Sequence, residues 1–266
     1  MNDSFESAER VIDADGRPYH IGVGPGEVAD QILLVGDPAR AKRAAARFSS
    51  IEGEWQNREF TTITGLFEGT RLSVMATGIG CDNTEIALIE LAQLVDDATL
   101  IRAGTCGAVN SDLSVGDLVI TWGALRLENT STHFVPESYP AVAHPDVIAA
   151  IERAAKAIDA PHRLGMTATS SGFYGGQGRR IEGFPPRNPN LVDELEQIGV
   201  QNLEMETSTL LTLASLRGFR AGAVCTVFAE RAANKFVKPG DKHKYEDRVV
   251  DVGLRALVDL AASREG

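Results

Sequence analysis

Short apolar runs alternate with amphipathic segments along almost the whole chain, and this alternation limits the folds that it can adopt. Strands are expected at residues 31–36, 61–67, 70–76, 100–103, 117–124, 163–170 and 221–228. Helices are expected at residues 39–48, 83–94, 145–158, 191–197, 206–217 and 248–263. This order is typical of a mixed or parallel sheet with helices on both faces. The sequence therefore predicts an α/β fold with three layers.

The length favours one large domain, since 266 residues can bury a sizeable core. Residues 1–17 are polar and acidic, and we expect them to form a mobile lead-in. Residues 18–266 are expected to form the folded domain.

Composition excludes several classes of function. The net charge of −11 argues against nucleic-acid binding, which needs basic patches. No apolar run approaches the ~18 residues that cross a bilayer, and the polar start is unlike a signal peptide. The three cysteines are odd in number and show no metal-ligand spacing, so neither a zinc site nor a disulfide framework is indicated. We expect a soluble, cytoplasmic protein with reduced thiols.

Two strand ends carry the features of an anion site. Gly36 and Arg40 follow the apolar run at residues 32–35. Arg102 and Thr105 follow a second, shorter apolar run, Leu100-Ile101. A glycine turn exposes backbone N–H groups at a strand end, and arginine adds a fixed cationic fork. Together the two ends predict a phosphate pocket, although glycine after a strand is common.

The segment at residues 173–180 (Phe-Tyr-Gly-Gly-Gln-Gly-Arg-Arg) predicts a base-binding loop. Gln177 can donate and accept hydrogen bonds in one plane, Arg179 adds donors, and Phe173 offers a flat face. This set suits a ring with alternating carbonyl and N–H groups, as in a pyrimidine. A glycine-rich surface turn is the competing interpretation.

The segment at residues 202–207 (Asn-Leu-Glu-Met-Glu-Thr) predicts a sugar site. Glu206 can accept paired hydrogen bonds from the vicinal hydroxyls of a ribose, while Met205 covers the sugar face. The alternative is that both glutamates of the segment lie in a first helical turn, where the helix dipole favours them.

The chain resembles the uridine phosphorylase branch of the nucleoside phosphorylase family, from about Tyr19 to about Arg231. The resemblance rests on the order and spacing of seven short motifs: Gly36-Asp37-Pro38-x-Arg40, Arg58-Glu59-Phe60-Thr61-Thr62, Thr77-Gly78-Ile79-Gly80, Arg102-x-Gly104-Thr105-x-Gly107, His133-Phe134-x-Pro136, Phe173-Tyr174-x-Gly176-Gln177-x-Arg179 and Glu204-Met205-Glu206.

The resemblance implies a role for each matching residue. Phosphate would be held by Gly36, Arg40, Arg102 and Thr105, with Arg58 added from a neighbouring subunit. Ribose would be held by Met205 and Glu206, with His20 reaching across the interface to the 5′ hydroxyl. Uracil would be held by Phe173, Gln177 and Arg179, with Arg231 nearby. Gln177, Arg179 and Glu206 would carry the catalytic effect.

The resemblance also implies a homo-oligomer built from dimers that share active sites, typically a hexamer in this family. It implies no cofactor, since inorganic phosphate is a co-substrate. A monovalent cation such as K⁺ would lie between subunits near Glu59, Ile79 and Asn83, although the run Cys81-Asp82-Asn83 departs from the family pattern.

The implied activity is reversible phosphorolysis of uridine to uracil and ribose 1-phosphate. Deoxyuridine, thymidine, cytidine or a purine nucleoside are alternative substrates. Purine-specific relatives carry an acid after the late strand, where this chain has Ala229, with Glu230 one step away. A phosphate-independent nucleosidase and a nucleoside-binding sensor without catalysis are the alternatives from other classes.

Overall fold

The computed structural model describes residues 7–263, and the strands among them form one sheet. The strands are β1 (Gln31–Val35), β2 (Ser50–Asn57), β3 (Phe60–Phe67), β4 (Thr70–Ala76), β5 (Thr99–Ala108), β6 (Leu118–Leu127), β7 (Ala141–Val142), β8 (His162–Ser170), β9 (Val200–Glu204), β10 (Arg220–Glu230) and β11 (Lys235–Phe236). The α-helices are α1 (Pro38–Ala45), α2 (Cys81–Leu91), α3 (Pro145–Ala157), α4 (Leu191–Gln197), α5 (Thr207–Arg217) and α6 (Lys242–Ala262).

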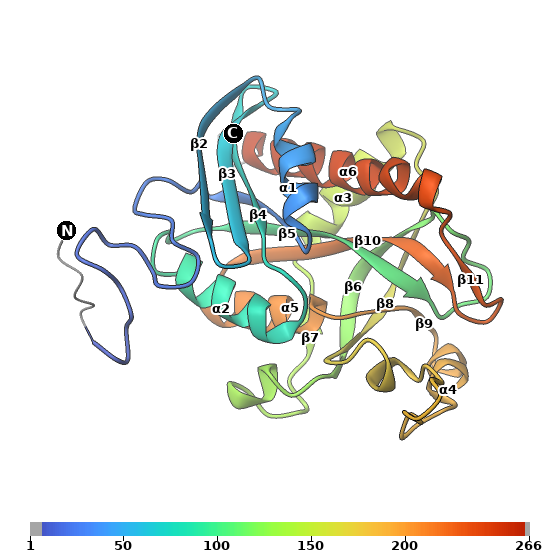
Figure 1. Ribbon diagram of the computed structural model, residues 1–266. Helices are drawn as coiled ribbons and strands as arrows, with labels where there is room; N and C mark the ends of the chain where they lie inside the picture. The colour runs from blue at the N-terminus through green and yellow to red at the C-terminus, as the bar shows by residue number, and fades with distance from the viewer. Residues whose placement is uncertain (1–6, 264–266) are drawn as a thin grey trace.

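Helices cover both faces of the sheet, as Figure 1 shows. Side chains of α1, α3 and α6 share one apolar core with Leu33 and Val35 of β1. Side chains of α2 and α5 share a second core with Ile32 and Leu34 of the same strand. Because successive side chains of a strand point to opposite faces, β1 supplies both cores. The predicted α/β architecture is confirmed.

The sheet is mixed, and part of it closes into a ring. Strand β5 pairs with β10 along its length and with β9 at Gly107 and Ala108. Strand β10 pairs with β6, β6 with β8, and β8 with β9, which completes the circuit. Closure brings β9 and the start of α5 beside the carboxyl end of β5, although they are about a hundred positions apart in sequence.

Strand β5 is longer than the sequence indicates. The run Gly104 to Gly107 is typical of a turn, yet it stays extended because residues 103–108 pair with residues 224–230 of β10. A Cβ at Gly104 would stand 2.9 Å from the Cys225 Sγ, so the small residues here permit a close approach of side chains. The predicted strand end at residue 103 is wrong for this reason.

Four strands were not expected, and two of them, β7 and β11, have only two residues each. Strand β2 is mostly exposed and polar, and it pairs only with β3. Its sequence therefore lacks the run of apolar residues from which a buried strand is recognised. Strand β9 is short and almost wholly buried, which gives no alternation to recognise.

Residues 1–6 of the predicted lead-in lie outside the described residues. In the remainder Ile12 is buried, and Arg17 donates a hydrogen bond to the Gly22 carbonyl at 3.1 Å. The division at residue 17 stays a prediction. No helix within residues 7–263 has both the length and the apolar character needed to cross a membrane.

We predict that Gly253→Val in α6 destabilises the protein by about 1–3 kcal/mol, because α6 lies directly on β1. A Cβ at Gly253 would already stand 2.5 Å from the Cδ1 of the fully buried Leu33. Chemical denaturation measures the effect. The control is Ala261→Val, at a half-buried position of the same helix; an equal loss in both variants would contradict the packing explanation.

Candidate active site

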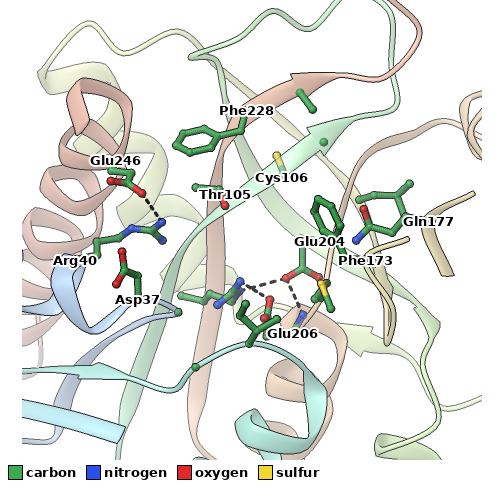
Figure 2. Close-up of a pocket in the computed structure, with 18 of the residues that line it drawn as sticks. Asp37, Arg40, Thr105, Cys106, Phe173, Gln177, Glu204, Glu206, Phe228 and Glu246 are labelled. Atoms are coloured by element: carbon green, nitrogen blue, oxygen red, sulfur yellow. Dashed lines mark hydrogen bonds and ion pairs between the residues drawn. The ribbon is translucent and has the colours of Figure 1, made fainter. Parts of the chain in front are cut away.

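A cavity of about 890 Å³ opens at the carboxyl ends of β1, β5, β9 and β10 (Figure 2). Ligands of open α/β sheets collect at this edge of the strands. Nine of the predicted site residues line the cavity: Gly36, Arg40, Arg102, Thr105, Phe173, Gln177, Arg179, Met205 and Glu206. Residues from four separate segments of the chain therefore meet in one place.

Arg102 is buried at the floor of this cavity between two carboxylates. Its Nε donates to Glu204 Oε2 at 3.2 Å, and its Nη2 donates to Glu206. Burial acts to lower the pKa of Arg102, but Glu206 and Glu204 outweigh that effect and raise it. The guanidinium thus stays charged, and the three groups together carry one negative charge when both carboxylates are ionised.

Glu206 joins the turn before α2 to the start of α5. Its Oε1 accepts a hydrogen bond from the Gly80 N–H at 2.7 Å, while its other oxygen bonds Arg102. Burial raises the pKa of Glu206, and nearby Glu204 adds to the rise while Arg102 opposes it. Glu204 is held by Thr169 Oγ1 at 2.6 Å and by the N–H groups of residues 206 and 207.

The anion-binding features meet where the β1–α1 turn approaches β5. Asp37 caps α1 by accepting the Ala39 N–H at 2.9 Å. Arg40 in the first turn of α1 is 6% exposed, and its Nη1 donates to the Ala103 carbonyl at 3.4 Å. Its Nη2 donates to Glu246 of α6 at 2.8 Å, as Figure 2 shows.

The opposite wall is formed by the loop after β8. Arg179 Nη1 donates to Gln177 Oε1 at 2.6 Å, and its guanidinium carbon lies 3.7 Å from the centre of the Phe173 ring. Arg231 donates through Nη2 to the Gln177 carbonyl at 2.9 Å. Burial, followed by the charge of Arg231, lowers the pKa of Arg179 to about 10. The loop is therefore an ordered cationic wall rather than a free turn.

Three predicted residues do not line this cavity: Arg231, which only bonds the loop at the Gln177 carbonyl, and also His20 and Arg58. His20 Nδ1 lies 2.6 Å from Glu90 Oε1, and its backbone N–H also bonds that carboxylate. Arg58 donates to the Tyr19 hydroxyl at 2.7 Å and stacks over the Tyr19 ring. Both stay away from the site of their own chain.

The residues named for a cation do lie at the cavity, since Glu59, Ile79 and Asn83 line it. A Cβ at Gly78 would stand 2.6 Å from Asn83 Nδ2 and 3.4 Å from Glu59 Cγ. The two side chains therefore converge on that glycine. Within residues 7–263 no group of three or more His, Cys, Asp or Glu is arranged to hold a metal ion.

Sequence reasoning missed several cavity residues. They are Cys106, Phe228, Phe236, Val237, Lys242 and Glu246. For the apolar residues among them, nothing in the sequence distinguishes a cavity wall from the core. Glu246 could have been found, because a glutamate on the apolar stripe of the last helix indicates a buried partner. The three cysteines are free thiols and buried, and burial raises the pKa of Cys106 well above its usual range.

We predict that Arg102→Met costs about 3–5 kcal/mol of stability, because it leaves two carboxylates buried without their cation. The pKa of Glu206, already raised, should rise further. A carboxylate with a raised folded-state pKa binds its proton more tightly in the folded state. The variant should therefore lose stability as pH rises above the ordinary glutamate value of 4.5.

Urea denaturation at about pH 5 and about pH 8 measures this dependence. Arg153→Met removes an exposed ion pair with Asp259 and serves as the control. Its loss should be at most about 1 kcal/mol at either pH. A loss in Arg102→Met that does not change with pH would contradict the assignment.

The chain is similar to a known protein family over most of its length. Residues 30–262 match the Phosphorylase superfamily. A uridine phosphorylase of Thermococcus kodakarensis is 44% identical over 244 residues, which cover 91% of this chain and 88% of that protein. The uridine phosphorylase of Escherichia coli is 35% identical over 90% of this chain and 96% of that protein.

A guanosine phosphorylase of Halorubrum lacusprofundi is 35% identical over 78% of this chain and 81% of that protein. Among solved structures, a Trypanosoma brucei nucleoside phosphorylase described as showing uridine phosphorylase activity superposes with a TM-score of 0.90. It is 29% identical, and the match covers 94% of this chain and 99% of that one. From its sequence, its fold and its relatives, the chain belongs to the phosphorylase superfamily.

Proposed function

We propose that this protein is a uridine phosphorylase, a pentosyltransferase that converts uridine and phosphate to uracil and ribose 1-phosphate. One observation carries the proposal. A single cavity holds two buried arginines on one side and the Gln177–Arg179 pair on the other, with Glu206 between them. Relatives named uridine phosphorylase at 35–44% identity support it.

Phosphate would bind beside Arg40, Arg102 and Thr105, against the N–H groups of the Gly36 turn. An arginine matches the oxygens of phosphate through its planar fork of donors. The short-range site prevails over the acidic surface of the protein, because distant charges are screened beyond about 8 Å at physiological salt.

Ribose would bind at Glu206 with Met205 over the sugar face. Glu206 is bonded to Arg102 in the structure. A sugar diol that donates to Glu206 would therefore compete with Arg102 for the carboxylate and free its Nη2 for phosphate. The two substrates would in this way be coupled through one guanidinium.

The base would stack on Phe173, with its edge toward Gln177 and Arg179. Uracil presents a carbonyl, an N–H and a second carbonyl in order, which an amide and a guanidinium can satisfy. Cytosine would turn an amino group toward Arg179 and place donor against donor. Arg231 braces the loop through the Gln177 carbonyl.

In the reaction the glycosidic bond breaks while the sugar gains oxocarbenium character and uracil gains negative charge. Phosphate, held by the arginines, attacks the anomeric carbon, and its charge stabilises the cationic sugar. Arg179 and Gln177 donate to the uracil oxygens as charge develops there. A fixed donor of this kind is typically worth ~3–4 kcal/mol in the barrier.

The residue at the position where purine-specific relatives carry an acid disfavours purine nucleosides as substrates. Ala229 lines the cavity and cannot protonate a leaving purine. The neighbouring Glu230 accepts from Lys235 at 3.0 Å and from the Val115 N–H at 3.1 Å, and the Lys235 bond leads in lowering its pKa. Its carboxylate is thus engaged elsewhere, although one relative bears the name guanosine phosphorylase.

The active unit would be a dimer that shares its sites, assembled into a hexamer in the cytoplasm. His20 would reach the ribose 5′ hydroxyl of the neighbouring site, and Arg58 would reach its phosphate. Their position outside the cavity of their own chain supports this sharing. A K⁺ ion near Glu59, Ile79 and Asn83 would bridge the subunits.

The activity is tested by release of free base from a nucleoside panel, with and without phosphate. We expect uracil from uridine in the presence of phosphate, together with ribose 1-phosphate. Cytidine and guanosine should be turned over far more slowly. Base release at the same rate without phosphate would indicate a nucleosidase, and tight uridine binding without turnover would indicate a sensor.

Site sharing is tested by mixing two inactive variants, Arg58→Ala and Arg179→Ala. Each variant alone should lose about a hundredfold or more in turnover, in line with the loss of one charged donor. After joint unfolding and refolding, mixed dimers should contain one intact site and regain part of the activity. The absence of any regain, with both variants folded, would count against shared sites.

A further inference from the structure

Glu246 of α6 is a charged residue for which the proposed reaction has no use. Its side chain is fully buried, yet it lines the cavity next to Arg40 (Figure 2). Burial acts to raise the pKa of Glu246, but the bond from Arg40 leads the effects that lower it. A buried, ionised carboxylate at a site that would bind an anion needs an explanation, because repulsion alone would favour its loss.

Four cationic or ionisable side chains surround this carboxylate. Arg40 Nη2 lies 2.8 Å from Oε1, and Arg43 Nη2 bonds Oε2. His243 Nδ1 lies 3.2 Å from Oε2, and Lys242 Nζ lies 3.9 Å from Oε1. The Glu246 carboxylate thus faces at least three positive charges, of which Arg43 also pairs with Asp247 at 3.6 Å.

The bond to Glu246 determines how Arg40 is held. Arg40 Nη2 is fixed by the carboxylate and its Nη1 by the Ala103 carbonyl of β5. Its Nε is buried and has no hydrogen-bond partner among the described residues. The guanidinium is therefore clamped between α6 and β5, and these two bonds use two of its five N–H groups.

We infer that Glu246 is a positioning residue for phosphate, which acts by fixing the guanidinium of Arg40 toward the cavity. The inference rests on the proposed role of Arg40 as a phosphate ligand. Glu246 reaches Arg40 from a helix 206 positions later in the chain, so α6 is coupled to the anion site through this one ion pair.

Charge and geometry predict opposite effects of changing Glu246, and this makes the inference testable. If Glu246 acted only as a nearby negative charge, its removal would strengthen phosphate binding. If it positions Arg40, its removal would weaken phosphate binding, because Arg40 and Arg43 would then compete for a weaker acceptor. Glu246→Asp keeps the charge but withdraws the carboxylate by one methylene, and so changes geometry alone.

The experiment measures the KM for phosphate and the KM for uridine in Glu246→Asp and Glu246→Gln. We expect the KM for phosphate to rise about tenfold, the lower end of the loss seen when the hydrogen-bond partner of a metal ligand is removed, with little change in the KM for uridine. The gain in melting temperature from added phosphate should shrink in parallel, which gives a readout independent of turnover. Glu246→Asp is the variant that decides if Glu246→Gln does not fold.

Arg43→Gln is the matched control. It breaks another ion pair of the same carboxylate, together with the pair of Arg43 and Asp247, but leaves the bond to Arg40, so stability should fall while the KM for phosphate stays close to wild type. A KM for phosphate that is unchanged or lower in Glu246→Asp would overturn the inference. An equal rise in Arg43→Gln would also overturn it, since the effect would then belong to the whole cluster.

Arg40→Ala separates this inference from the proposed function. If Arg40→Ala raises the KM for phosphate and Glu246→Asp does not, the positioning role is wrong and the phosphate site stands. If Arg40→Ala leaves the KM for phosphate unchanged, the assignment of Arg40 as a phosphate ligand fails, and the role of Glu246 fails with it.

Discussion

The ion pairs of Arg102 with Glu204 and Glu206 connect the parts of the molecule that form the cavity. Arg102 lies on β5, Glu204 ends β9, and Glu206 precedes α5. Burying a carboxylate costs several kcal/mol unless a cation and further hydrogen bonds compensate. Backbone N–H groups and Thr169 supply those bonds here. The contacts that hold β9 and α5 against β5 in the ring of strands therefore also assemble the site.

A second buried pair, Arg40 with Glu246, joins the other side of the cavity to α6. Arg40 and Arg102, the two arginines that line the cavity of this chain and would bind phosphate, are thus held by carboxylates in the structure. Their charges are compensated within the protein, so neither guanidinium is left buried without a counterion. Their orientation is fixed before a ligand arrives, which lowers the ordering cost of binding.

Much of this arrangement could be predicted from the sequence. The strand at residue 31 and the helix after it follow from an apolar run and a glycine turn. The grouping of Arg40 with Arg102 follows from the rule that parallel strands end at one edge. Pairings across long separations could not be predicted. The extension of β5 through Gly107 depends on β10, and the partner of Arg40 lies on the last helix.

The ring of strands also determines where the sheet remains open. Strands β5, β10, β6, β8 and β9 protect one another, so β2 is left as one border of the sheet. Unpaired backbone groups at such a border invite pairing with another chain. Strand β2 carries Glu52 and Glu54 and an irregular register between Ile51 and Gly53. Charged side chains on this border and a distorted strand would together discourage edge-to-edge aggregation of these molecules.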